Sequence, residues 1–158
     1  MTSSALKGQK FWVLGDTYTF YITGAETEKQ CAVLEISVPS GSGPPLHSHN
    51  KESESFYVID GKFSFQYGDE KTTVKPGASL YQKKGIPHTY KNVGKNVGRL
   101  LFTILPAGFE NFFAEVGILI ENEDTFSPPP IDTDYVTKVA RVATESYGLK
   151  VISNQGNG

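Results

Sequence analysis

The sequence predicts an all-β protein, a sandwich or barrel of short strands that is followed by one or two C-terminal helices. Apolar and polar side chains alternate with a two-residue period through the first hundred residues, and turns rich in Gly and Pro separate these runs. Beyond residue 105 the apolar spacing changes to that of helices. Short strands that are cut this closely by turns favour a sandwich or barrel over parallel α/β units.

Composition bounds the class of protein. A chain of 158 residues is long enough to bury a sizeable core, and we expect one domain over 1–152 with a flexible tail at 153–158. The formal net charge of −2 argues against a nucleic-acid partner, and no apolar run approaches the roughly 20 residues of a membrane span. The single cysteine, Cys31, excludes an intrachain disulfide. The N-terminal residues lack the apolar core of a signal peptide, so we expect a cytoplasmic location.

Individual strands follow from the alternation. The first two runs carry these apolar faces: Tyr18, Phe20 and Ile22, then Ala32, Leu34, Ile36 and Val38. Residues 56–59 and 62–67 flank Asp60-Gly61, which predicts a hairpin because a two-residue turn needs positive φ. Shorter strands are expected at 72–74, 78–82, 88–92 and 99–105.

Two helices are expected after the last strand. The first has one apolar face made of Phe109, Phe112, Phe113, Val116 and Leu119. The second covers 135–147, with Asp132 and Asp134 at its N-terminus and Gly148 at its end.

The three histidines are the candidate metal ligands. His47 and His49 are two residues apart, so in a strand they can present their imidazoles to one point, and His88 follows Pro87 further along the chain. Neutral imidazole is the commonest metal ligand in proteins. Two carboxylates, Glu52 and Glu54, come next, and spacing alone does not choose between them.

Strand parity helps to interpret the two carboxylates and the residues that follow. If a strand has begun by residue 54, Glu54 shares a face with Phe56 and Val58 and can point inward, whereas Glu52 lies in the exposed connection. Tyr90 shares the face of His88 by the same argument. We expect the substrate pocket to be lined by Phe56, Val58, Phe65 and Tyr90, and we interpret the remaining phenylalanines as core.

Two glycine-anchored patterns frame these residues. The pattern Gly41-x5-His47-Ser48-His49-x4-Glu54-x6-Gly61 resembles the first motif of the cupin superfamily. The pattern Gly77-x5-Lys83-x4-His88-x3-Asn92 resembles the second motif, except that Lys83 stands where the family usually has proline. The resemblance implies a double-stranded β-helix, or jelly-roll barrel. It also implies that His47, His49, Glu54 and His88 converge on one divalent transition metal, and the spacing to Gly61 favours Glu54 over Glu52.

The flanking segments narrow the resemblance. Residues 43–49 and 105–113 are similar to small bacterial cupins related to quercetin dioxygenase, in which a C-terminal helix packs near the barrel mouth. This implies a metal-dependent dioxygenase that joins O2 to a flavonol-like or other enolisable aromatic molecule, with Glu54 as ligand and general base. The ligand set does not select among Fe, Mn, Ni, Co, Cu and Zn.

Other functions remain open at this point, because one fold hosts many chemistries. The alternatives are a metal-dependent isomerase or lyase on a small polar substrate, and a non-catalytic small-molecule-binding cupin. Small cupins often pair through edge strands or N-terminal segments. The resemblance therefore implies a homodimer, with Phe11–Leu14 as a candidate contact.

Overall fold

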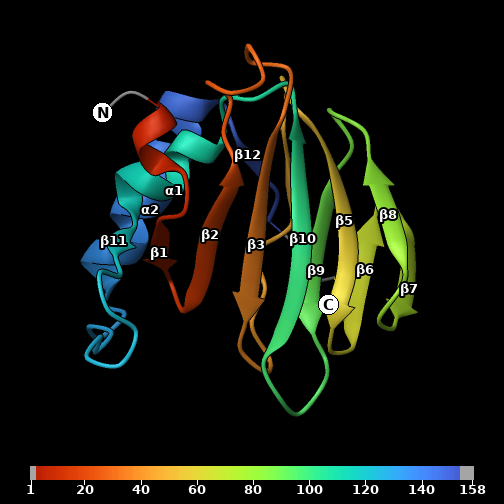
Figure 1. Cartoon of the computed structure of the whole chain (residues 1–158). Helices are drawn as coiled ribbons and strands as arrows, with labels where there is room; N and C mark the ends of the chain where they lie inside the picture. The colour runs from red at the N-terminus through yellow and green to blue at the C-terminus, as the bar shows by residue number, and fades with distance from the viewer. Residues whose placement is uncertain (1–2, 154–158) are drawn as a thin grey trace.

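Strands from the whole length of the chain form two antiparallel sheets (Figure 1). The computed structural model describes residues 3–153, and within this range one sheet has seven strands and the other five. The larger sheet has the order β11 (Ile118–Leu119), β1 (Lys10–Val13), β2 (Asp16–Ile22), β3 (Ala32–Val38), β10 (Gly98–Leu105), β5 (Ser53–Asp60) and β8 (Ser79–Gln82). The smaller sheet has the order β12 (Lys150–Val151), β4 (His47–Ser48), β9 (His88–Asn92), β6 (Phe63–Tyr67) and β7 (Glu70–Val74). A short 3-10 helix, η1 (Ser3–Leu6), precedes β1.

Aromatic side chains fill the space between the two sheets. Phe56 of β5 stacks on Phe102 of β10, with ring centroids 4.8 Å apart. The same ring contacts Phe65 of β6 and Tyr90 of β9 in the other sheet, at 5.4 and 5.6 Å. Each fully buried side chain of this size contributes roughly 1.5–3 kcal/mol through the removal of apolar surface from water. This cluster therefore holds the sheets together as one all-β barrel.

The inward faces predicted for β2 and β3 are correct except at one residue. Alternate residues of β3 are at most 1% exposed: Ala32, Leu34, Ile36 and Val38. In β2, Tyr18 and Phe20 are buried, but Ile22 is 38% exposed. The register with β3 shifts between Phe20 and Ile22, and such a bulge turns the following side chain to the other face.

The predicted hairpin at Asp60-Gly61 is wrong. Gly61 has the expected positive φ of 92°, but β5 pairs with β10 and β8, whereas β6 pairs with β7 and β9. Because both edges of β5 are occupied, the chain leaves the larger sheet after Asp60 and enters the smaller one. The turn is therefore a corner between the two sheets, as a jelly-roll barrel requires.

The first helix, α1 (Glu110–Val116), is shorter than its apolar pattern predicts. It ends at Gly117, whose N–H donates to Phe113 O at 3.0 Å. The backbone at Gly117 is extended, and a Cβ there would lie 2.3 Å from the same oxygen, so only glycine permits the chain to leave the helix in this way. Leu119 consequently belongs to β11, where it pairs with Phe11, and not to the helix.

The second helix, α2 (Thr133–Tyr147), agrees with the prediction at both ends. Asp132 accepts a hydrogen bond from Tyr135 N at 2.8 Å as the N-cap, and Gly148 adopts a left-handed φ of 68° after the last turn. Both helices lie at the side of the barrel next to β1 and β2 (Figure 1). After α2 the chain returns to the smaller sheet, where Val151 of β12 pairs with His47.

The N-terminal strand, β1, is packed within the chain. Both edges of β1 are paired within the chain, with β2 and β11. Phe11, Trp12 and Val13 are only 3–6% exposed. The homodimer, with Phe11–Leu14 as its candidate contact, stays a prediction.

The limits of the domain also stay a prediction. Of the tail expected at 153–158, all but Ser153 lies outside the described residues. Over residues 3–153 neither α1 nor α2 is long and apolar enough to cross a membrane.

Candidate metal centre

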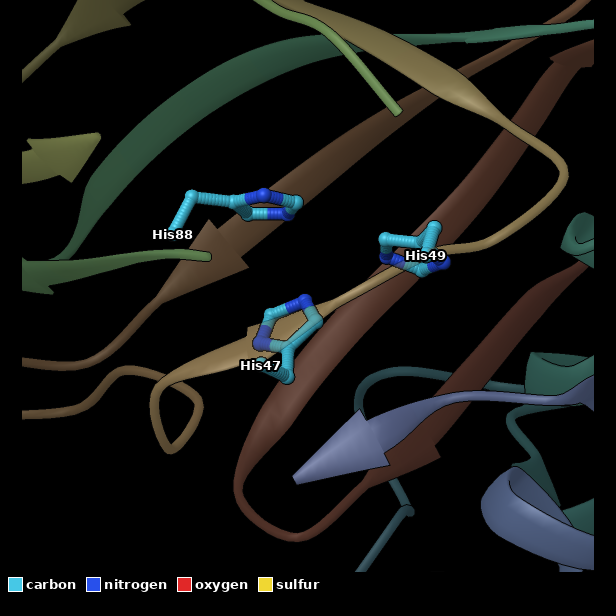
Figure 2. A group of neighbouring side chains, drawn as sticks. All are labelled: His47, His49 and His88. Carbon is cyan, nitrogen blue, oxygen red and sulfur yellow. The ribbon is translucent and has the colours of Figure 1, made fainter. Parts of the chain in front are cut away.

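The four predicted ligands come from both sheets. His47 of β4 lies directly opposite His88 of β9 in the antiparallel register, and His49 follows β4 by one residue. Glu54 is the second residue of β5, in the other sheet. Figure 2 shows the three imidazoles around a common space, and their ligand nitrogens all lie within 4.8 Å of one another. This arrangement is able to hold a metal ion.

A close backbone contact places His47 beside His88. The loop before β4 runs against β9 so tightly that a Cβ at Gly43 would lie 1.9 Å from Tyr90 O. Only glycine permits this approach, and Pro44 and Pro45 then restrict φ in the residues that lead to the strand. The segment Gly43-Pro44-Pro45 thus positions His47 beside His88.

The carboxylate of Glu54 bridges two of the histidines. Its Oε1 lies 2.8 Å from His49 Nε2 and its Oε2 lies 3.0 Å from His88 Nε2. Although the atoms are this close, neither nitrogen has a hydrogen-bond partner among the described residues, and both are buried. Imidazole nitrogens and carboxylate oxygens that converge this closely are able to act as ligands of one shared cation.

Backbone carbonyls set the orientation of two of the rings. His47 Nδ1 donates to Pro45 O at 2.7 Å, and His88 Nδ1 donates to Ile86 O at 3.0 Å. A carbonyl oxygen only accepts, so Nδ1 of each ring carries a proton, which leaves Nε2 as the nitrogen that is able to bind a metal. Both rings are therefore oriented to offer Nε2 to a metal.

The charge states also fit a metal. Burial and the neighbouring His88 ring lower the pKa of His47 to about 4, so this imidazole is neutral at pH 7. Although burial raises it, the imidazoles of His49 and His88 hold the pKa of Glu54 well below its usual range. Burial lowers the pKa of His49, but the Glu52 and Glu54 carboxylates outweigh this effect and raise it to about 9. Without metal, a proton on His49 thus balances the buried Glu54 carboxylate.

The position of Glu52 differs from the sequence-based interpretation, which placed this residue in an exposed connection. It is only 6% exposed, and its Oε2 lies 3.5 Å from His49 Nδ1. Strand parity does not apply to the loop between β4 and β5, and the loop folds back beneath the ring. His49 thus has a carboxylate behind it where His47 and His88 have carbonyls, and such an outer carboxylate raises the basicity of a ligating imidazole.

The candidate metal centre faces a cavity of about 260 Å³. His47, Glu54 and His88 lie in its wall, which is otherwise mainly apolar. Both helices contribute to this wall through Phe109, Phe112, Phe113, Val136, Val139, Ala140 and Ala143. Phe109 also packs edge-on against His49 with ring centroids 4.6 Å apart, so α1 covers that side of the centre.

Two of the four predicted pocket residues line the cavity. Phe56 and Tyr90 are in its wall, whereas Val58 and Phe65 are not. Val58 and Phe65 are at most 1% exposed and belong to the core beneath it, because an inward face contains more residues than the cavity reaches. Phe102, interpreted as core, contacts the cavity as well, as do the phenylalanines of α1.

Three further polar residues of the wall were missed from the sequence: Asp16, Tyr18 and Ser42. Asp16 and Tyr18 have the same parity as Phe20 in β2, so the alternation contained a signal for an inward carboxylate. That signal was obscured because Asp16 follows the turn at Leu14-Gly15, where an acidic residue is ordinarily solvated.

Comparison with known proteins agrees with this fold and site. Residues 34–104 match the family model of the cupin domain. The chain is 33% identical to an uncharacterized protein of Methanocaldococcus jannaschii over 63 residues. These residues make up 40% of this chain and 50% of that protein. It is 24% identical to quercetin 2,3-dioxygenase of Bacillus subtilis over 91 residues. These residues make up 58% of this chain and 27% of that enzyme. The matches thus span half the length of the first relative and about a quarter of the second.

Solved structures show the same fold at low identity. A predicted oxalate decarboxylase from Thermotoga maritima superposes with a TM-score of 0.58 and 19% identity, over 66% of this chain and 96% of that one. The nucleoside dehydratase Pac13 superposes with a TM-score of 0.54 and 18% identity, over 67% of this chain and 82% of that one. The fold and site define a jelly-roll barrel with a candidate metal centre in the wall of an internal cavity. The match of residues 34–104 to the cupin domain agrees with this fold and with the resemblance of the sequence motifs to the cupin superfamily.

Proposed function

We propose that this protein is a metal-dependent dioxygenase that acts on a small enolisable aromatic compound of the flavonol type. The observation that carries the proposal is the position of His47, Glu54 and His88 in the wall of a largely aromatic and aliphatic cavity. Such a cavity suits a flat apolar molecule with few polar groups. The similarity to quercetin 2,3-dioxygenase of Bacillus subtilis supports this choice of reaction.

The residues of the centre fit a divalent transition metal, and the four side chains would bind it jointly. His47, His49 and His88 offer imidazole nitrogens, and Glu54 offers a carboxylate oxygen. When bound, Fe, Mn, Ni, Co or Cu supplies the Lewis acidity and redox capacity for a reaction between an enolate and dioxygen.

Glu54 is the proposed general base. Its carboxylate is ionised at neutral pH because His49 and His88 hold its pKa well below the usual range, against the effect of burial. His88 lines the cavity and His49 does not, so Oε2, on the His88 side, is the oxygen that we assign to the substrate. In this role Oε2 accepts the proton of the enol hydroxyl and leaves the enolate in the cavity.

The cavity wall keeps water away from that enolate. Phe109, the N-cap residue of α1, covers His49, and Phe113 of the helix stacks on Tyr18 of β2 with ring centroids 3.9 Å apart. These contacts join α1 to the barrel over the centre. An enolate in such an apolar enclosure is protected from reprotonation by bulk water.

The cavity argues against an isomerase or lyase on a small polar substrate. A small anionic substrate of such a reaction needs a cationic side chain to hold it, but among the described residues no Lys or Arg lines the cavity. A non-catalytic binding protein has the same cavity, and turnover is what separates it from the dioxygenase.

Oxygen uptake with quercetin tests the proposal. Protein loaded with Fe, Mn, Ni, Co or Cu should consume oxygen with at least one of these metals, whereas the Zn-loaded protein should not, because Zn has no redox chemistry. At saturating metal, Glu54→Gln should abolish uptake, and the matched variant Glu52→Gln should retain it. If no metal supports uptake across a panel of enols, the protein is not a dioxygenase of this class.

A further inference from the structure

The cavity contains a second group of polar side chains besides the metal centre. Asp16, Tyr18, Ser42 and Tyr90 all lie in its wall. Across the larger sheet, the pairing register places Tyr18 of β2 in one row with Ile36 of β3, Leu100 of β10 and Val58 of β5. Val58 is four residues along β5 from Glu54. At about 3.3 Å per residue, this is an offset of roughly 13 Å along the strands. Tyr18 and the nearby Asp16 thus lie toward another end of the cavity than the candidate metal centre, whereas Tyr90, two residues along β9 from His88, lies nearer to the centre.

Asp16 is the unusual member of this group. It is only 6% exposed, and Ser42 Oγ donates to its Oδ1 at 2.7 Å. Among residues 3–153 no hydrogen bond reaches Oδ2, and no salt bridge includes this carboxylate. A buried carboxylate without a cation is costly, so an acid kept at this position requires a reason other than stability.

The two tyrosines link Asp16 to the metal centre. Tyr18 and Tyr90 both lie in the wall of the cavity with Asp16 and Glu54, and both are near enough to feel the charges of these two carboxylates. Burial, with the nearby Asp16 charge, raises the pKa of each phenol well above its usual range, so both stay neutral. Neutral hydroxyls beside a carboxylate form a site that is ready for one more hydrogen-bond donor.

We propose that Asp16, oriented by Ser42, binds a second hydroxyl of the aromatic substrate, at the end remote from the candidate metal centre. The inference rests on the proposed function and makes Asp16 a specificity-determining residue. The substrate class is an elongated aromatic compound with an enol at one end and a phenolic hydroxyl at the other. The phenol donates to Oδ2, and the apolar wall holds the rings between the two ends.

Binding of two matched flavonols to the metal-loaded protein tests this assignment. Quercetin carries hydroxyls on its outer rings, whereas 3-hydroxyflavone keeps the enol and lacks them. Asp16→Asn should weaken quercetin binding by about tenfold or more, since a hydrogen bond to a charged group is lost, and should change 3-hydroxyflavone binding by less than about twofold. Ser42→Ala, which removes the orienting hydroxyl, should give a smaller loss for quercetin only.

Glu35→Gln is the matched control. Glu35 is 8% exposed, but it pairs with Arg99 and does not line the cavity, so both affinities should stay unchanged. Equal losses for both flavonols in Asp16→Asn, or no loss for either, overturn the assignment. So does a wild-type protein that binds neither flavonol. Binding and oxygen uptake are separate measurements, so a protein that binds through Asp16 without turnover contradicts only the dioxygenase.

Discussion

Replacing Asp16 by asparagine is expected to stabilise the metal-free protein at neutral pH. Burial raises the pKa of Asp16 from 3.8 to about 6, and the hydrogen bond from Ser42 offsets part of this increase. At 1.36 kcal/mol per pKa unit, the ionised carboxylate lowers the free energy of unfolding by about 3 kcal/mol at pH 7. Asparagine fills the same space without the charge, so the variant should recover about 2–3 kcal/mol.

The sign of the pH dependence follows from the same values. The folded-state pKa lies above the unfolded-state pKa, so the folded protein holds the proton more tightly. The stability contributed by the protonated acid is complete below about pH 4 and is lost as the pH rises through about 6. The other titratable groups of the cavity wall, Tyr18, His47, Glu54, His88 and Tyr90, are present in both proteins and cancel in the difference.

Urea unfolding in the presence of a chelator, near pH 4 and at pH 7, measures this difference. The gain in Asp16→Asn should be close to zero near pH 4 and about 2–3 kcal/mol at pH 7. Glu35→Gln, an acid of similar burial that is paired with Arg99, should show no such gain. A variant that is no more stable than wild type at pH 7, or equally stabilised at both pH values, would refute the reasoning.

Three further predictions concern the metal centre and its support. Glu52→Gln should lower metal affinity by about 10–100-fold in calorimetric titrations, because the carboxylate behind His49 is lost; unchanged affinity would argue against that role. Metal must displace the proton that His49 holds below its pKa of about 9, so affinity should rise up to about tenfold per pH unit between pH 6 and 8, and a flat profile would contradict this. Asn92→Ala should lower the free energy of unfolding by about 2–3 kcal/mol in urea titrations, because the amide donates to Val38 O and Asn96 O; wild-type stability would count against it.

Motif spacing predicts the candidate ligands well, because side chains around one metal need a particular register between particular strands. The opposition of His47 and His88 and the inward position of Glu54 both follow from that register. Local rules fail where the chain is not a regular strand. Parity could not place Glu52, which lies in a loop that folds back beneath His49.

Long-range pairing explains the other differences between sequence and structure. Asp60-Gly61 has the chemistry of a hairpin turn, but which strands pair depends on β10 and β8, which are far away in the sequence. Likewise, parity places Val58 on an inward face, but only the position of the helices determines which inward residues reach the cavity. Asp16 was missed for the same reason, because its surroundings come from the loop at Ser42 and from β9.

Metal content tests the central claim most directly. Elemental analysis of protein purified without added metal should find close to one transition metal per chain, and His47→Ala and His88→Ala should lose it while keeping their β-sheet circular dichroism. Those two histidines face each other across β4 and β9, and it is Nδ1 of each ring that bonds to a backbone carbonyl. A wild-type protein without metal, or folded variants that retain it fully, would contradict a metal centre at these residues.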